Sequence, residues 1–171
     1  MLTERNYFFG HYEFVNMAKR TAGVPVLCKD FIFDQYQIYH ARLIGADAIL
    51  LIVRLLAPDV LRDFLRRAKD IGLDCLVETH TREEVRIAVE SGADIIGVNN
   101  RDLADFSVRL ETAEELAPMI PESVVKVAES GINTSDDIAR LQKSGYRAFL
   151  VGEALVTSAD PVGLLNSMRG V

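Results

Sequence analysis

Short apolar runs alternate six times with longer segments of helical period along this chain, and this repeat constrains the fold more than any other feature. Runs this apolar, bounded by turn signals, are typical of buried parallel strands. We predict strands at residues 25–29, 48–53, 75–78, 95–99, 124–128 and 148–152. All but the fifth follow a glycine suited to a left-handed helix end, namely Gly23, Gly45, Gly72, Gly92 and Gly145.

The segments between the runs carry helix signals. Pro58 precedes an amphipathic stripe that begins at Leu61, which predicts a helix with the proline in its first turn. Further helix starts are indicated at Thr81 with Glu84, Thr112 with Glu115, and Asp160 with Pro161. No linker or shift in composition divides the chain, so we expect residues 1–171 to form a single domain.

Alternating strands and helices predict a parallel sheet with right-handed crossovers. A doubly wound open sheet and an incomplete arc of a (β/α)₈ barrel both satisfy this pattern. A whole barrel usually needs about 250 residues, whereas this chain has 171. Strand count alone therefore favours the open sheet, but the chemistry of the strand ends favours the barrel arc. Such an arc leaves two strand edges unpaired, and these predict a homo-oligomer or a rearranged terminal segment that lies over the gap.

Composition excludes several classes of protein. The 25 acidic and 19 basic residues give a net charge of −6, which argues against a nucleic-acid partner. The longest apolar runs fall short of the roughly 18 residues of a membrane span, and the N-terminus lacks the pattern of a signal peptide. Cys28 and Cys75 lie in apolar runs, which suggests reduced thiols in a cytoplasmic protein. Cysteine and histidine spacings match no metal motif, so we expect no metal.

Polar side chains occur at the ends of the predicted strands. In parallel α/β folds the active site forms where the carboxyl ends of the strands meet. The residues at these ends that carry ionisable or amide groups are Lys29, Asp30, Arg54, Glu78, His80, Asn99, Asn100, Arg101, Asp102, Glu129 and Glu153. Together they predict a polar ring at one end of the sheet.

Most of these side chains allow two interpretations. Lys29 is either a solvated strand-end lysine or a general acid. Glu78 either forms a salt bridge with Lys29 or Arg54, or completes an acid–base pair with the lysine. Asn99 either caps a turn or orients a substrate hydroxyl. Arg101 is either a surface arginine or a ligand for a carboxylate or phosphate.

Glu129 has the strongest local case for a functional role. It follows an apolar strand and precedes Ser-Gly, where a buried charge needs a reason. His80 and Asp30 we interpret as structural.

Glycines after the last two strands indicate a phosphate site. Ser130, Gly131 and Gly152 stand where barrels often hold a phosphate, and glycine lets an anion approach backbone N–H groups. The alternative is that Gly131 only makes a turn. Glu153 would repel a phosphate, so we expect its carboxylate to point away from the site.

Five segments resemble the indole-3-glycerol phosphate synthase family, in the family's order and spacing. They are VPVLCKDFIFDQYQIYHARLIGADAILLIV, LVETHTREE, IIGVNNRDL, VAESGI and FLVGEAL. The resemblance implies a (β/α)₈ barrel that closes the indole ring of carboxyphenylamino-deoxyribulose phosphate and releases CO₂ and water. It also implies a small phosphorylated substrate and neither metal nor organic cofactor.

The resemblance assigns roles residue by residue. Lys29 matches the general acid of ring closure, and Glu78 matches the carboxylate that moves protons in the dehydration. The substrate contacts are matched by Phe31, Asn99, Arg101 and Glu129. The phosphate contacts are matched by Ser130, Gly131 and Gly152, with Glu153 where some members carry serine.

The match begins at LTERNYF, which in the family follows the second barrel strand. We therefore expect an N-terminally truncated member that lacks the first strand, most of the second, and the first strand's catalytic glutamate and lysine. Such a chain is expected to be weakly active or inactive by itself. The alternatives are a non-catalytic or self-assembling barrel fragment with a residual phosphate site, and an unrelated open-sheet phosphate binder.

Overall fold

The computed structural model describes residues 1–102 and 104–170. Their contacts form two compact units. Unit 1 comprises Met1–Glu78 with Glu90–Ala93, and unit 2 comprises Thr79–Val89 with Asp94–Val171. The single domain expected from composition stays a prediction.

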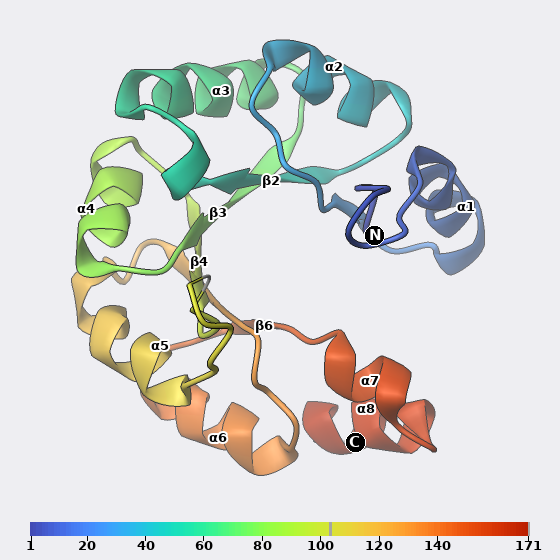
Figure 1. Ribbon diagram of the computed structural model, residues 1–171, viewed down its shortest axis with the longest axis vertical. Coiled ribbons are helices and arrows are strands. Elements are labelled where there is room, and N and C mark those ends of the chain that lie inside the picture. The colour runs from blue at the N-terminus through green and yellow to red at the C-terminus, as the bar shows by residue number, and fades with distance from the viewer. Residues whose placement is uncertain (103, 171) are drawn as a thin grey trace. The chain divides into compact units, whose positions relative to one another are not determined.

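Unit 1 is built from three parallel strands and the helices between them. In chain order its elements are α1 (Tyr12–Ala22), β1 (Leu27–Cys28), α2 (Gln35–Leu43), β2 (Ala48–Ile52), η1 (Val53–Leu55), α3 (Pro58–Asp70) and β3 (Asp74–Thr79), the last ending at the unit boundary. Strand β2 pairs in parallel with β1 and with β3. Figure 1 shows α2 and α3 side by side next to β2. Ile49 and Leu51 of β2 and Leu61 of α3 are fully buried.

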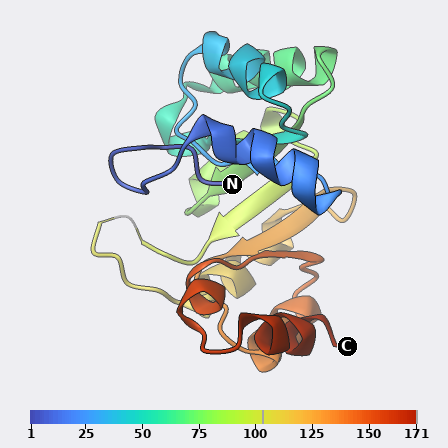
Figure 2. The same ribbon diagram turned by 90° about the vertical axis from the view of Figure 1, so that its right-hand side faces the viewer.

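Unit 2 repeats this plan. Its elements are α4 (Arg82–Glu90), which lies largely in this unit, β4 (Ile95–Asn99), α5 (Leu110–Leu116), η2 (Ala117–Met119), β5 (Val125–Glu129), α6 (Ser135–Lys143), β6 (Ala148–Leu150), α7 (Glu153–Thr157) and α8 (Pro161–Arg169). Strand β5 pairs in parallel with β4 and with β6. Figure 2 shows α7 and α8 side by side after β6. The hydroxyl of buried Tyr146 donates to the Ala113 carbonyl at 2.7 Å. This bond links the segment just before β6 to α5.

The strand order follows the chain from β1 to β6. In a doubly wound sheet the spatial order of the strands does not follow the chain, because it changes direction at a central switch point. Sequential parallel strands with a helix after each are the arrangement of a (β/α) barrel. The prediction of an incomplete barrel of six βα units is therefore confirmed, and each predicted apolar run overlaps one strand.

Most predicted helix ends are confirmed. Each of the five glycines named above has a positive φ. Asp160 caps α8 by accepting the N–H of Gly163 at 2.9 Å. The capping box at Thr81 is half formed: its hydroxyl accepts the N–H of Glu84, whose carboxylate instead accepts the N–H of His80.

The predicted helix start at Thr112 is wrong. Helix α5 begins at Leu110 with Arg109 at its N-cap, so Thr112 lies inside the helix. The side chain of Asn100 accepts the N–H of Ala113 at 3.0 Å. A residue outside the helix thereby accepts an N–H near its start, and the local sequence carries no sign of this contact.

The first residues of the chain run along the free side of β1. The N–H of Lys29 donates to the Met1 carbonyl at 2.9 Å, and the N–H of Thr3 donates to the Lys29 carbonyl at 3.2 Å. Leu2 and Lys29 thus form a parallel bridge. This edge of β1 is covered by residues 1–3.

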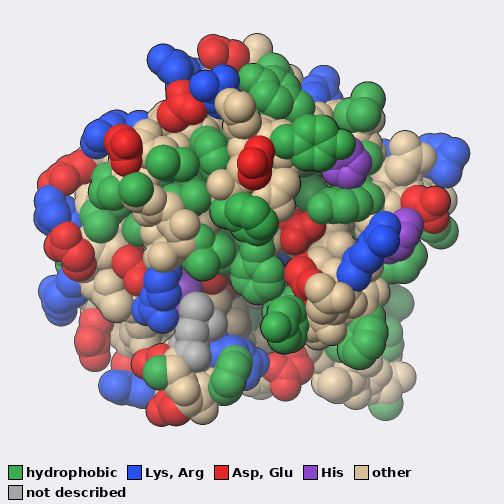
Figure 3. All heavy atoms as spheres, turned by 45° about the horizontal axis from the view of Figure 1, so that its top comes forward, with side chains coloured by type: hydrophobic (Ala, Val, Ile, Leu, Met, Phe, Trp, Pro, Cys, Tyr) green, Lys and Arg blue, Asp and Glu red, His purple; other side chains and the backbone are tan. Residues whose placement is uncertain are grey.

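Charges of both signs are interspersed on the face drawn in Figure 3, and hydrophobic side chains gather between them. The exposed hydrophobic residues include five phenylalanines between residues 8 and 33, namely Phe8, Phe9, Phe14, Phe31 and Phe33. Within the described residues, every helix is too short or too polar to cross a membrane.

Candidate active site

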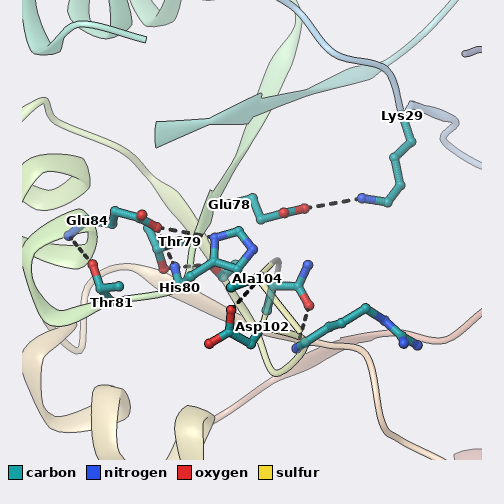
Figure 4. Close-up of polar contacts among 11 residues, drawn as sticks. Lys29, Glu78, Thr79, His80, Thr81, Glu84, Asp102 and Ala104 are labelled. Atoms are coloured by element: carbon teal, nitrogen blue, oxygen red, sulfur yellow. Dashed lines mark hydrogen bonds and ion pairs between the residues drawn. The ribbon is translucent and has the colours of Figure 1, made fainter. Parts of the chain in front are cut away.

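Unit 1 pairs a lysine with a carboxylate at the ends of its strands. Lys29 directly follows β1, and Glu78 is the penultimate residue of β3. Nζ of Lys29 lies 3.3 Å from Oε2 of Glu78 (Figure 4). The Glu78 side chain is only 4% exposed, whereas that of Lys29 is 25% exposed. The buried carboxylate therefore meets a cation that solvent can still reach, and such a pair can give a proton and take one back.

Phe31, two residues after this lysine, forms an aromatic pair with Phe8, which is distant in sequence. Phe31 is 37% exposed, and its ring centre lies 6.2 Å from that of Phe8. The preceding Asp30 accepts the Thr3 hydroxyl at 2.7 Å and the N–H of Phe31 at 2.8 Å, so it holds the backbone of this segment. The sequence analysis assigned Phe31 but missed Phe8, whose place beside it depends on a contact between distant residues.

Unit 2 places Asn99 and Arg101 at the end of β4. Oδ1 of Asn99 accepts the N–H of Arg101 at 3.0 Å, so this asparagine caps a turn. The Arg101 guanidinium lies 2.8 Å from a carboxylate oxygen of Glu153, the first residue of α7. Glu153 therefore directs its charge at an arginine, which offsets its repulsion of any nearby anion.

Glu129 ends strand β5 directly beside Asn99 of β4. Glu129 as a whole is 1% exposed, which makes it one of the most deeply buried polar residues in the described part of the chain. A carboxylate this deeply buried is costly to desolvate unless its surroundings or a ligand stabilise it.

The turn after Glu129 has an unusual backbone. Ser130 has a φ of +64° and Gly131 a φ of +75°. A Cβ on Gly131 would lie 2.4 Å from Cγ1 of Val108, so glycine is also required by space. Gly152, which follows β6 closely, has open space on its Cβ side. Open glycine backbone is the feature that lets a phosphate approach.

Asn100 stands at the end of a predicted strand, but the sequence analysis assigned it no role. Its residue is 2% exposed, and both of its side-chain polar groups are engaged. Nδ2 donates to the Ser130 carbonyl at 3.1 Å, and Oδ1 accepts the N–H of Ala113 at 3.0 Å. The one available signal was a second asparagine directly after a predicted strand, in the segment VNNRD.

His80 has the structural environment expected for it. Its side chain is 5% exposed, and Nδ1 lies 3.2 Å from Oε2 of Glu84, as Figure 4 shows. The neighbouring hydroxyl of Thr79 donates to the Gly97 carbonyl at 2.8 Å. Among the described residues, no group of three or more His, Cys, Asp or Glu side chains is arranged to hold a metal ion.

Comparisons with known proteins found a matching family model, curated relatives and solved structures of similar fold. Residues 1–167 match the model of the family described as indole-3-glycerol phosphate synthase. A relative of that name from Chlorobium limicola is 51% identical over 160 residues, which cover 94% of this chain and 62% of the relative. A second, from Dehalococcoides mccartyi, is 51% identical over 165 residues and 63% covered. The chain thus spans less than two thirds of the length of these curated relatives.

A solved structure of 3-hexulose-6-phosphate synthase from Salmonella typhimurium has a TM-score of 0.80 with this chain. The match covers 94% of this chain and 79% of that one at 18% identity. At this identity the likeness concerns the fold alone.

Proposed function

The chain belongs to the indole-3-glycerol phosphate synthase family, and on that premise we propose that it supplies the acid–base pair and the phosphate contacts of such a synthase. The proposed reaction is a step of tryptophan biosynthesis, the ring closure of carboxyphenylamino-deoxyribulose phosphate with loss of CO₂ and water. It is a carboxy-lyase reaction. The observation that carries the proposal is the Lys29–Glu78 pair at 3.3 Å.

Ring closure requires a proton at the substrate's carbonyl oxygen while the aromatic ring attacks the carbonyl carbon. The ammonium of Lys29 can donate this proton, and the carboxylate of Glu78 holds the ammonium in place. Departure of CO₂ then returns its bonding electrons to the ring. In the dehydration the new hydroxyl takes up a proton and leaves as water, while the adjacent ring carbon loses a proton as the double bond of the indole forms. Glu78 is assigned the transfer of a proton in this step.

The remaining polar residues serve as substrate contacts in this proposal. Phe31, with Phe8 beside it, offers an exposed apolar surface to an aromatic ring. Asn99 and Arg101 orient polar groups of the substrate, and Glu129 accepts hydrogen bonds from its hydroxyls. These roles rest on their places at or after the ends of β1, β4 and β5.

The phosphate is assigned to the backbone of Ser130, Gly131 and Gly152, together with Glu153, the residue that follows Gly152. Two successive residues with positive φ and a glycine with open space favour close approach of an anion. The ion pair of Glu153 with Arg101 supports this assignment, because it offsets the negative charge of the residue that follows Gly152.

The second candidate function is a non-catalytic barrel fragment that keeps a phosphate site. It is favoured by length, since the chain covers only 62% of the Chlorobium limicola relative. In both cases we propose a cytoplasmic protein that forms homo-oligomers, needs no cofactor and binds neither nucleic acid nor membrane.

A fluorescence assay for indole-3-glycerol phosphate separates the two functions. It compares this chain with a chimera in which the chain replaces the matched 160 residues of the Chlorobium limicola relative. We expect turnover by the chimera and much slower or undetectable turnover by the chain. A chimera that folds, as judged by circular dichroism, but shows no turnover would contradict the catalytic proposal.

A further inference from the structure

Asn100 is a buried polar residue that has no role in the proposed mechanism. It lies in unit 2 directly after β4, and its residue is 2% exposed. Its backbone N–H donates to the Glu129 carbonyl at 2.9 Å, and its carbonyl accepts the N–H of Arg109 at 3.0 Å. With its two side-chain bonds it makes four hydrogen bonds to four residues, which lie on two segments: the end of β5 with the turn after it, and the start of α5.

One of these bonds determines the direction of a peptide group. Nδ2 of Asn100 donates to the Ser130 carbonyl at 3.1 Å. That carbonyl shares a planar trans peptide with the N–H of Gly131, and in such a group the C=O and the N–H point in opposite directions. Anchoring the carbonyl on Asn100 therefore directs the Gly131 N–H to the opposite side.

The anchored peptide follows a residue in a costly conformation. Ser130 has a φ of +64° although it carries a Cβ, and L-residues other than glycine rarely adopt such values. Surrounding contacts must maintain a conformation of this kind. The bond from Asn100 is the contact that acts on the carbonyl of Ser130 itself.

We infer that Asn100 is a positioning residue, which holds the Ser130–Gly131 turn so that its backbone N–H groups face a phosphate. The inference rests on the proposed function, because it takes this turn to be part of the phosphate site. Asn100 acts through Ser130 and does not touch the anion. Aspartate cannot replace it at neutral pH, because a carboxylate has no donor for the carbonyl.

The test is a titration with inorganic phosphate, followed by the amide resonances of Ser130 and Gly131, with chloride at equal ionic strength as the reference. Asn100→Ala is expected to weaken phosphate binding about tenfold, the equivalent of one lost well-placed hydrogen bond. It is also expected to move the Cα and Cβ shifts of Ser130 away from left-handed values.

Tyr146→Phe is the matched control. Tyr146 donates a buried hydrogen bond to the Ala113 carbonyl at 2.7 Å, so its loss weakens the same helix that Asn100 holds. It leaves the bond to Ser130 intact. We expect Tyr146→Phe to lower the unfolding midpoint in urea while phosphate affinity and the Ser130 shifts stay as in the wild type.

Asn100→Asp gives a second readout if the alanine variant does not fold. It keeps an acceptor for the N–H of Ala113 and loses only the donor to Ser130. Because its charge also repels phosphate, the Ser130 shifts are the measurement for this variant, and they are expected to change.

The outcomes separate the inference from the proposed function. If the wild type binds phosphate and Asn100→Ala binds it equally well, or if both Asn100 variants keep the wild-type Ser130 shifts, the inference is overturned and the phosphate site stands. If phosphate leaves the wild-type resonances of Ser130 and Gly131 unmoved, the phosphate site itself fails, and the positioning role fails with it.

Discussion

Nζ of Lys29 lies 3.3 Å from Oε2 of Glu78, although the two residues are 49 positions apart in the chain. Parallel pairing of β1 with β2 and of β2 with β3 brings their strand ends together. The contact joins a carboxylate that is almost fully buried to a lysine that solvent reaches. The sequence analysis expected a contact between these two side chains because both stand at the ends of predicted parallel strands, and the strand order brings them together.

The two glycines assigned to phosphate should respond differently to substitution. Gly131→Ala is expected to cost about 2 kcal/mol of unfolding free energy, because a Cβ is strained at positive φ and must displace Val108. Gly152→Ala should stay within about 0.5 kcal/mol, since a Cβ there meets open space. Urea unfolding measures both values.

Phosphate titration supplies the second half of this comparison. Gly152→Ala should weaken phosphate binding even though it spares stability, because the added methyl group stands where the anion approaches. Unchanged affinity in that variant would remove Gly152 from the phosphate site.

Asp47 should make stability depend on pH. Its carboxylate accepts Lys19 Nζ at 2.9 Å and the N–H of Val26 at 2.6 Å, and these bonds lower the pKa of Asp47. A lowered folded pKa gives stability that is present above the unfolded value of about 3.9 and is lost as pH falls through the folded value. The gain is at most about 1 kcal/mol, because solvent screens a pair about a third exposed.

Asp47→Asn provides the comparison. The urea midpoint of the wild type should exceed that of the variant near neutral pH, and the difference should shrink below pH of about 4. A difference that stays constant down to the acid transition would show that the ion pair with Lys19 contributes nothing.

The buried hydroxyl of Thr79 should matter for stability. It donates to the Gly97 carbonyl at 2.8 Å, and the residue is fully buried. Thr79→Val keeps the shape but leaves that carbonyl without this donor, which should cost about 1–3 kcal/mol. Thr21→Val is the matched control: it removes an exposed hydroxyl–carbonyl bond, to Met17, that water can replace. Equal losses in urea unfolding would contradict this prediction.

Association should follow from the strand edges. Strands β1 and β6 are the first and last in the strand order. Residues 1–3 cover the free side of β1, so the prediction rests on the edge of β6. An edge strand with unpaired backbone groups favours pairing with another chain. Sedimentation velocity should therefore show a dimer or larger species. A monomer over the whole accessible concentration range would contradict the homo-oligomer prediction.

Sequence pattern predicted the architecture well because its signals are local. An apolar run between turn residues identifies a buried strand, and glycine before the run identifies the helix end, as Gly72 and Gly92 show. Strand lengths were less predictable: β1 contains only Leu27 and Cys28, because Lys29 beyond them bridges to Leu2 instead.

Contacts between distant residues account for what the sequence analysis missed. The start of α5 was misplaced because Asn100 satisfies a helix donor 13 positions later in the chain. The ion pair of Arg101 with Glu153 spans 52 positions and was likewise not foreseen. Candidate site residues could be named from their places after strands, whereas their partners depend on how loops from different strands meet.

A double-mutant cycle on Lys29 and Glu78 tests the proposed catalytic pair most directly. Lys29→Ala, Glu78→Gln and the double variant are made in the chimera, and turnover is followed by indole-3-glycerol phosphate fluorescence. Each single variant should lose about 10²–10⁴-fold, and the double variant should be hardly slower than the slower single one, because groups that act as a unit are not additive. Single variants that keep the turnover of the unsubstituted chimera would show that the Lys29–Glu78 contact is a structural salt bridge only.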